Sequence, residues 1–137
     1  YCSLLSAITQ VSVNQGFAIT GSMNQLGEVQ AIGGVNEKIE GFFKLCEIRG
    51  LNGKQGVIVP RDNVKHLMLH QNVIQAVTDG KFHIYAVKHV YEALQLLMNM
   101  EPGQIDEKGE FPKDSLNGKA QAALKKLFEL YQETEEE

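Results

Sequence analysis

The chain has 137 residues, of which 43% are hydrophobic and 22% are charged, a composition typical of one globular domain with a real core. Its formal net charge is −4 and it has no basic stripe, which argues against a nucleic-acid-binding function. No apolar run approaches the length of a membrane span and no signal peptide is visible, so we expect neither a membrane protein nor a secreted one.

The first half of the chain is predicted to contain the end of a helix, a β-hairpin and an amphipathic helix. Residues 1–10 are typical of the last turns of a helix, and strands over 17–23 and 28–32 flank a turn with Asn and Gly. A helix is predicted from about Val35 to Arg49, with Gly50 as its end. Apolar residues recur along it with a 3.6-residue period, namely Val35, Ile39, Phe42, Phe43 and Cys46.

The second half is predicted to alternate strands and helices. The apolar run 57–59, ended by Pro60, is typical of an interior strand of a mixed or parallel sheet. Asp62 or Asn63 is a candidate N-cap for a short helix through Met68. A helix over 73–79, a strand over 82–87 and an amphipathic helix over 89–98 follow.

The last third of the chain changes in composition. Residues 101–117 are rich in Pro, Gly and charged side chains and are predicted to form an exposed linker. Residues 118–137 are predicted to form a C-terminal helix and an acidic tail, with the helix starting near Leu116 and the chain fraying from Gln132. The apolar face of this helix is expected to dock either on the same domain or on a neighbouring subunit.

Lys38 lies in an unusual place for a lysine, the first turn of the helix 35–49. It precedes Ile39 by one position and Phe42 by one turn, so we expect it on or beside the buried stripe. Backbone N–H groups at a helix N-terminus disfavour an ammonium group, and partial burial does the same. Both effects favour a neutral amine, which can act as a general base. Spacing alone favours the alternative, in which the lysine stem covers apolar surface and the amine reaches water.

These residues also carry a family resemblance. The run AITGSMNQLGEVQAIGGVNEKIEGFFK resembles the signature of the Lon protease family's proteolytic domain, which has Thr-Gly on one strand, Gly-x-Val on the next, then Gly-Gly and a helix opening x-x-Glu-Lys. GVIVPRDN (56–63) and GKFHIYAVKHVYEAL (80–94) resemble the family's next strand and turn and its final strand and helix. The resemblance covers residues 1–98 and is nearest to the Lon-related proteases of bacteria. It implies an α+β fold with a mixed β-sheet, a β-hairpin and packed helices, and a proteolytic domain over 1–100.

The resemblance implies a role for four residues. Lys38 matches the catalytic lysine, the general base of a Ser-Lys dyad, and Thr20 matches the strand threonine whose hydroxyl orients the lysine amine. Gly33 and Gly34 match the tight connection that places the lysine. Ser22 departs from the pattern, because commoner family members carry Glu after Thr-Gly. From the residues alone, Thr20 is a strand threonine chosen for β propensity.

The nucleophile of the implied dyad is not among these residues. In the family, the nucleophilic serine opens the helix before the Thr-Gly strand, which places it a few residues upstream of Tyr1. Ser3 and Ser6 lie beyond that place, on the body of the helix, and are interpreted as packing residues. We therefore expect the 137-residue chain to be inactive by itself.

The expected function is that of an ATP-dependent serine endopeptidase that cleaves unfolded or damaged proteins. The resemblance implies a hexameric ring and an upstream ATPase module that holds ATP and Mg²⁺, with no cofactor in this domain. Cys2 and Cys46 are expected to be free thiols, which suits a reducing, cytoplasmic location. No metal site is expected, because His66 and His70, spaced to share a helix face, have no third ligand. The rival function is that of a non-proteolytic scaffold or oligomerisation domain of an ATPase.

Overall fold

The computed structural model describes residues 1–135, which form two compact units. The sheet unit is Asn14–Ala93, and the helical unit comprises Tyr1–Val13 with Leu94–Glu137. The fold is α+β, as predicted. Residues 136–137 of the predicted acidic tail lie outside the described residues.

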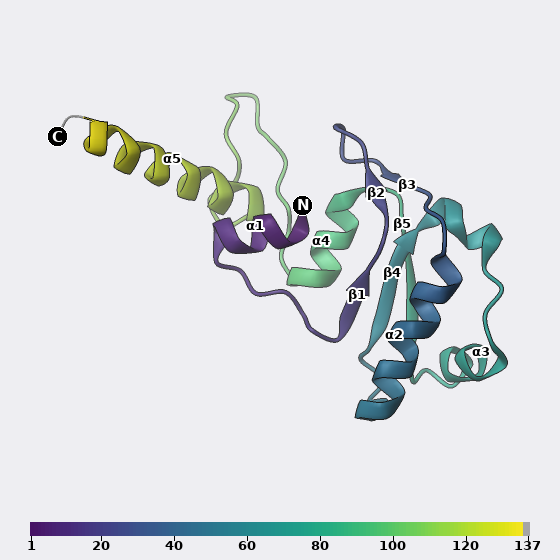
Figure 1. The fold of residues 1–137 in the computed structure, drawn as a ribbon. Helices are drawn as coiled ribbons and strands as arrows, with labels where there is room; N and C mark the ends of the chain where they lie inside the picture. The colour runs from purple at the N-terminus through teal and green to yellow at the C-terminus, as the bar shows by residue number, and fades with distance from the viewer. Residues whose placement is uncertain (136–137) are drawn as a thin grey trace. The chain divides into compact units, whose positions relative to one another are not determined.

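The sheet unit is built on three parallel strands (Figure 1). β4 (Gly56–Pro60) lies between β1 (Phe17–Ile19) and β5 (His83–Val87), with Val57 in register with Ala18 on one side and Ile84 on the other. All five residues of β4 are buried. This confirms the predicted interior strand, because a strand with a neighbour on each edge and cover on both faces has no side for polar side chains.

The predicted strand 17–23 is in fact two strands. β1 ends at Ile19, and β2 (Ser22–Met23) leaves the sheet to pair antiparallel with β3 (Val29–Gln30). The hairpin turn is closed by Asn24, whose side-chain oxygen accepts the N–H groups of Leu26 and Glu28, both at 3.0 Å. Ser22 donates its hydroxyl proton to Gln30 Oε1 at 3.0 Å, so this departure from the family pattern supports the hairpin.

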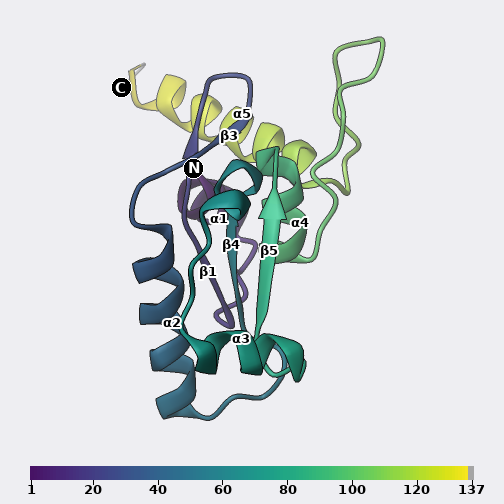
Figure 2. The same ribbon diagram turned by 90° about the vertical axis from the view of Figure 1, so that its right-hand side faces the viewer.

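One face of the sheet is covered by α2 (Val35–Arg49), and α3 (Gln71–Thr78) crosses near the strand starts (Figure 2). Val35, Ile39, Phe43 and Cys46 of α2 are buried, which confirms the helix and its apolar stripe. They form one core with side chains of β4 and α3 and with Phe82, whose ring meets Phe43 edge to face at 5.2 Å. The sheet unit is therefore centred on the α2–β4 contact.

Between β4 and α3 the chain makes a 3₁₀ helix, η1 (Arg61–His66). Neither Asp62 nor Asn63 caps it: η1 begins after Pro60 without a side-chain cap, so the predicted capping role is wrong. Asn63 is instead buried inside the unit and bonds to the backbone of Ile32.

The helical unit pairs α1 (Cys2–Thr9) with α5 (Leu116–Glu135). Of α4 (Val90–Met98), the residues from Leu94 onward belong to this unit. Ser6 donates its hydroxyl proton to the carbonyl of Val11 at 2.6 Å and so helps to end α1, in keeping with a packing role. α5 continues to Glu135, so the predicted fraying from Gln132 is wrong for residues 132–135. In the part of the chain that the structure describes, no helix combines the length and hydropathy needed to cross a membrane.

The segment predicted as a linker is a closed loop. Leu116 N–H donates to the carbonyl of Glu101 and Asn117 N–H to that of Pro102, both at 2.9 Å, so the two ends of the segment lie side by side. Gly103 has φ 82°, and a Cβ there would clash with the side chain of Ser115. Residues 104–110 are exposed, as predicted, but Pro102 and Ser115 are buried.

Candidate functional site

The predicted site residues gather at one end of the parallel strands. Thr20 follows β1 directly, and η1 follows β4. α2 runs back from the β2–β3 hairpin to the start of β4, so its first turn, with Lys38, lies at the carboxyl ends of the strands (Figure 2). Binding and catalytic groups favour this end of a parallel sheet because the loops that follow the strands converge there.

Thr20 is positioned by the sheet. Its backbone N–H donates to the carbonyl of Ile58 at 3.0 Å, which extends the β1–β4 ladder by one residue beyond β1. The residue is half-buried. The backbone of Thr20 is therefore held by the central strand, at the point where the chain turns out of the sheet.

The two glycines before α2 have different roles. Gly34 is the N-cap of α2 with φ 68° and ψ 27°, a left-handed conformation that costs other residues energy, and its carbonyl accepts the N–H of Lys38 at 3.2 Å. Gly33 has no positive φ, and a Cβ there would meet no atom within 4 Å. Only Gly34 is required by the backbone that begins α2.

We expect Gly34→Ala to lower the free energy of unfolding of the 137-residue chain by about 1–2 kcal/mol, the cost of a left-handed L-residue. Gly33→Ala is the matched control and is expected to change it by less than about 0.5 kcal/mol. Urea denaturation followed by circular dichroism measures both. Equal losses for the two variants would contradict the different roles of the two glycines.

Lys38 itself is exposed, so the partial burial predicted for it is wrong. The reason is angular: at about 100° per residue, Lys38 lies about 90° around α2 from the middle of the buried stripe. Its neighbour Glu37 is exposed as well. Within residues 1–135 no hydrogen bond joins the Lys38 amine to the Thr20 hydroxyl, so the orienting role of Thr20 stays a prediction.

Asn63 is the best-buried polar side chain near these residues. It is 2% exposed, and its amide makes two bonds to one residue: Oδ1 accepts the N–H of Ile32 and Nδ2 donates to the carbonyl of Ile32, both at 2.9 Å. Asn63 thus pairs with Ile32 as a neighbouring strand would. It fixes the chain directly before Gly33 and Gly34, and so the point from which α2 starts.

A second amide, that of Asn36, holds the first turn of α2. Asn36 Nδ2 donates to the carbonyl of His66 at 3.1 Å, and Asn36 Oδ1 accepts the N–H of Met68 at 2.9 Å. One turn later, Glu40 accepts the N–H of His70 at 2.9 Å and lies 3.3 Å from its ring Nε2. The first two turns of α2 are therefore tied to the segment between η1 and α3.

Sequence reasoning missed the roles of Asn36 and Asn63. An asparagine shortly after a strand-ending proline can either cap a following helix or bond to a distant backbone segment from a buried position. Only the tertiary structure decides which backbone groups it reaches. Nothing in the residue pattern distinguishes the two.

His66 and His70 do not share a helix face, which corrects the expectation from their spacing. His66 ends η1 and His70 precedes α3. In the described residues, no three or more His, Cys, Asp or Glu side chains are grouped so that they could hold a metal ion.

Cys46 is a core thiol, and Cys2 and Cys46 are both free, as predicted. Cys46 is 3% exposed. Burial raises the pKa of the Cys46 thiol above its usual value, and the positive charge of Arg49 offsets this only in part. A protonated thiol within the core is a poor nucleophile, so Cys46 has no catalytic role here.

The Cys46 thiol predicts a pH dependence of stability. Because the folded state holds this proton to higher pH than the unfolded state, whose thiol titrates at about 8.5, the free energy of unfolding is expected to fall as the pH rises above that value. Cys46→Ala removes this contribution and leaves that of Cys2. Denaturation at pH 7, 9 and 10 should therefore show a steeper loss for the parent chain than for the variant. If the free energy of unfolding fell equally with pH in the parent chain and in Cys46→Ala, the raised pKa of the Cys46 thiol would be contradicted.

Comparison with known proteins agrees with the residue pattern. Residues 1–100 match the model of the Lon protease (S16) C-terminal proteolytic domain. Over 99 residues, 72% of this chain and 17% of the relative, the chain is 57% identical to the putative Lon protease homolog of Escherichia coli (strain K12). It is 48% identical to the protein of the same name from Haemophilus influenzae over 101 residues, 74% of this chain and 17% of that protein. It is also 33% identical to the archaeal Lon protease of Archaeoglobus fulgidus over 93 residues, 68% of this chain and 13% of that protein.

The chain thus spans less than a fifth of the length of these relatives. The family match covers the whole sheet unit and α1, and it includes Thr20, Gly33, Gly34 and Lys38. The chain belongs to the family of Lon protease C-terminal proteolytic domains.

Proposed function

We propose that this chain is the proteolytic domain of a cytoplasmic, ATP-dependent serine endopeptidase that cleaves unfolded or damaged proteins. The observation that carries the proposal is the family match over residues 1–100 together with a lysine in the first turn of α2. Thr20 and Lys38 lie at the same end of the parallel strands, and the start of α2 is anchored by Asn36 and Asn63. A general base must be attached to a rigidly held backbone, because small displacements of a catalytic group strongly reduce the reaction rate.

The proposed chemistry uses a serine that lies upstream of Tyr1. Its hydroxyl attacks the peptide carbonyl, the neutral amine of Lys38 takes the hydroxyl proton, and the same group returns it to the leaving amine. Water then hydrolyses the acyl-enzyme. The Thr20 hydroxyl orients the Lys38 amine. Since Lys38 is exposed in this chain, the proposal requires that the serine-bearing segment and neighbouring subunits of a hexameric ring exclude water from the amine.

ATP and Mg²⁺ belong, in this proposal, to a module upstream of Tyr1, and the domain described here binds no cofactor. The test is ATP-dependent degradation by the full-length protein of a permanently unfolded substrate such as casein. We expect cleavage products to accumulate with ATP, and the 137-residue chain to yield none under the same conditions. Hydrolysis of ATP without any cleavage of casein would contradict the proposal.

The exposed position of Lys38 favours a second candidate, a non-proteolytic Lon-like scaffold or oligomerisation domain of an ATPase. In that case the full-length protein assembles and hydrolyses ATP but cleaves no peptide bond, and Lys38 is an ordinary solvent-exposed lysine. The two functions make opposite predictions for the casein experiment.

A further inference from the structure

The tetrapeptide Leu-Asn-Gly-Lys occurs twice in the chain, at 51–54 and at 116–119. An Asn-Gly pair readily loses the asparagine amide, because glycine has no Cβ to shield its backbone nitrogen. That nitrogen can attack the side-chain carbonyl carbon of the preceding asparagine and form a cyclic imide. Since the two copies have the same residues on both sides of the reacting bond, a difference in their reactivity has to come from the structure.

The first copy lies in the connection between α2 and β4 (Figure 2). Asn52 is exposed, so water reaches its side chain. Its Oδ1 accepts the N–H of Lys54 at 2.9 Å, and this donor stabilises the negative charge that develops on Oδ1 when the Gly53 nitrogen attacks. Within residues 1–135 no hydrogen bond holds the Gly53 N–H. The attacking nitrogen and the carbonyl are therefore both available in the folded chain.

The second copy forms the first turn of α5, and hydrogen bonds hold both of its reacting groups. The Gly118 N–H, which would have to attack, donates to Ser115 Oγ at 3.1 Å. Asn117 Nδ2, which would have to leave, donates to the carbonyl of Gly103 at 3.0 Å. Asn117 is also only 8% exposed. The same four residues are therefore bound and covered here, whereas they are open to solvent in the first copy.

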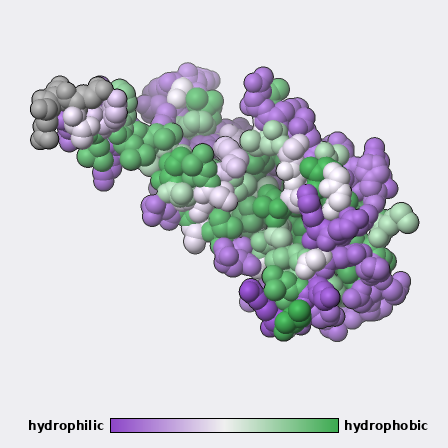
Figure 3. Space-filling model, viewed as in Figure 1, coloured by the Kyte–Doolittle hydropathy of each residue, from purple (hydrophilic) through white to green (hydrophobic). Residues whose placement is uncertain are grey.

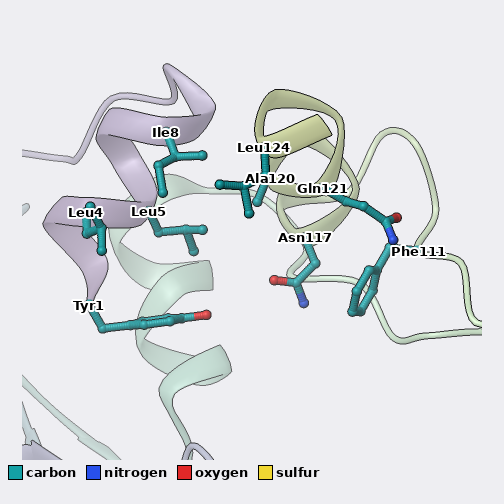
Figure 4. Close-up of a pocket in the computed structure, with 9 residues that line it drawn as sticks. All are labelled: Tyr1, Leu4, Leu5, Ile8, Phe111, Asn117, Ala120, Gln121 and Leu124. Carbon is teal, nitrogen blue, oxygen red and sulfur yellow. The ribbon is translucent and has the colours of Figure 1, made fainter. Parts of the chain in front are cut away.

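The cover over the second copy is confined to the start of α5. Leu116 is 0% exposed and Ala120 is 9% exposed, whereas hydrophobic side chains of the later turns lie at the surface (Figure 3). Asn117 and Phe111 both line a pocket of about 390 Å³ in the helical unit (Figure 4). Ring closure requires rotation of the Asn117 backbone out of its helical conformation, which would break both hydrogen bonds. The second copy must therefore open locally before it can react.

We propose that Asn52 is a site of spontaneous deamidation in the folded protein and that Asn117 is protected from this reaction. The Gly53 nitrogen forms a bond to Cγ of Asn52 while the Cγ–Nδ2 bond breaks, and Nδ2 leaves as ammonia with the proton of the Gly53 amide. Water then adds to one of the two imide carbonyls and breaks its C–N bond. The product is aspartate or isoaspartate at position 52, and solvent water is the only co-reactant.

Deamidation adds a negative charge to the connection between α2 and β4. The carboxyl end of α2 carries partial negative charge, so a carboxylate beside it is unfavourable. Isoaspartate also adds one methylene to the main chain directly before Gly53, whose carbonyl lies 2.8 Å from His83 Nε2 on β5. We therefore expect modified chains to unfold at a lower urea concentration than unmodified ones. The connection lies at the opposite end of the strands from the candidate site, so this inference does not rest on the proposed function.

Incubation of the 137-residue chain at mildly alkaline pH, followed by brief digestion with trypsin and mass spectrometry, tests the proposal. Trypsin releases the two copies in separate peptides, 50–54 and 114–119, because each copy ends in lysine. We expect conversion at Asn52 to be at least about 10-fold faster than at Asn117. In concentrated urea the two rates should become equal, since the local sequences are the same. A folded chain in which Asn52 reacts no faster than Asn117 overturns the proposal.

Ser115→Ala tests the source of the protection. The substitution removes the acceptor of the Gly118 N–H, which is also the cap of α5, and is expected to speed conversion at Asn117 by about 5-fold, the usual effect of losing a helix N-cap. The rate at Asn52 in the same sample is the matched control and should not change. Circular dichroism measures whether the helices are retained. An unchanged rate at Asn117 in the folded variant overturns protection by the start of α5.

Discussion

Replacement of Lys38 by alanine in the full-length protein is expected to reduce ATP-dependent peptide-bond cleavage by about 10³-fold, the effect of removing a general base. Because the side chain is exposed, the free energy of unfolding should change by less than about 0.5 kcal/mol. Lys38→Arg is expected to be equally inactive, since a guanidinium group does not give up its proton near neutral pH.

Lys44→Ala is the matched control for this experiment. Lys44 is an exposed lysine of the same helix, without a predicted catalytic role, and its loss should leave the cleavage rate unchanged. The comparison needs the cleavage rate, the ATPase rate and the assembly state of each variant. Cleavage by Lys38→Ala at the parent rate would show that another group is the base.

Replacement of Asn63 by leucine is expected to have the largest effect on stability, a loss of about 3 kcal/mol. The substitution keeps the number and branching of the side-chain heavy atoms but leaves the N–H and the carbonyl of Ile32 without their partners at a site from which water is excluded. Urea denaturation of the 137-residue chain measures the loss.

Asn36→Leu provides the comparison, because it also removes two amide bonds to the backbone. Asn36 is half-buried and its partners lie on the exposed segment before α3, so water can replace the lost bonds and the cost should be about 1 kcal/mol. A loss for Asn63→Leu that is no larger than that for Asn36→Leu would contradict the idea that the buried amide anchors the start of α2.

The elements with a strong apolar period could be predicted from the sequence. α2 lies where its stripe of Val35, Ile39, Phe43 and Cys46 placed it, and β4 is the interior strand that its unbroken apolar run indicated. Both depend on side chains that enter the core next to their own backbone, so local pattern and tertiary burial agree. The hairpin turn at Asn24 could also be predicted from the local sequence, because the asparagine side chain bonds to residues two and four positions away.

Features that depend on distant partners could not be predicted. The predicted strand 17–23 divides after Thr20 because its first half pairs with β4 and its second half pairs with β3. Asn63 is buried because it bonds to the backbone of Ile32, which is 31 residues away in the sequence. Lys38 is exposed because no other described segment covers its flank of α2. Periodicity predicts the centre of a buried stripe more accurately than its edges, so this result could not be predicted from the sequence. The closed loop before α5 has the same origin, because hydrogen bonds join Leu116 to Glu101 and Asn117 to Pro102 at its two ends.

The proposed Ser-Lys dyad is tested most sharply by trapping the acyl-enzyme. The full-length protein would be incubated with a slowly hydrolysed peptide ester, quenched in acid and mapped by peptide mass spectrometry, beside its Lys38→Ala variant. If the proposed dyad is right, the parent protein forms an acyl group on one serine upstream of Tyr1, and the variant forms none. An acyl group on Ser3 or Ser6, or equal acylation of parent and variant, would contradict it.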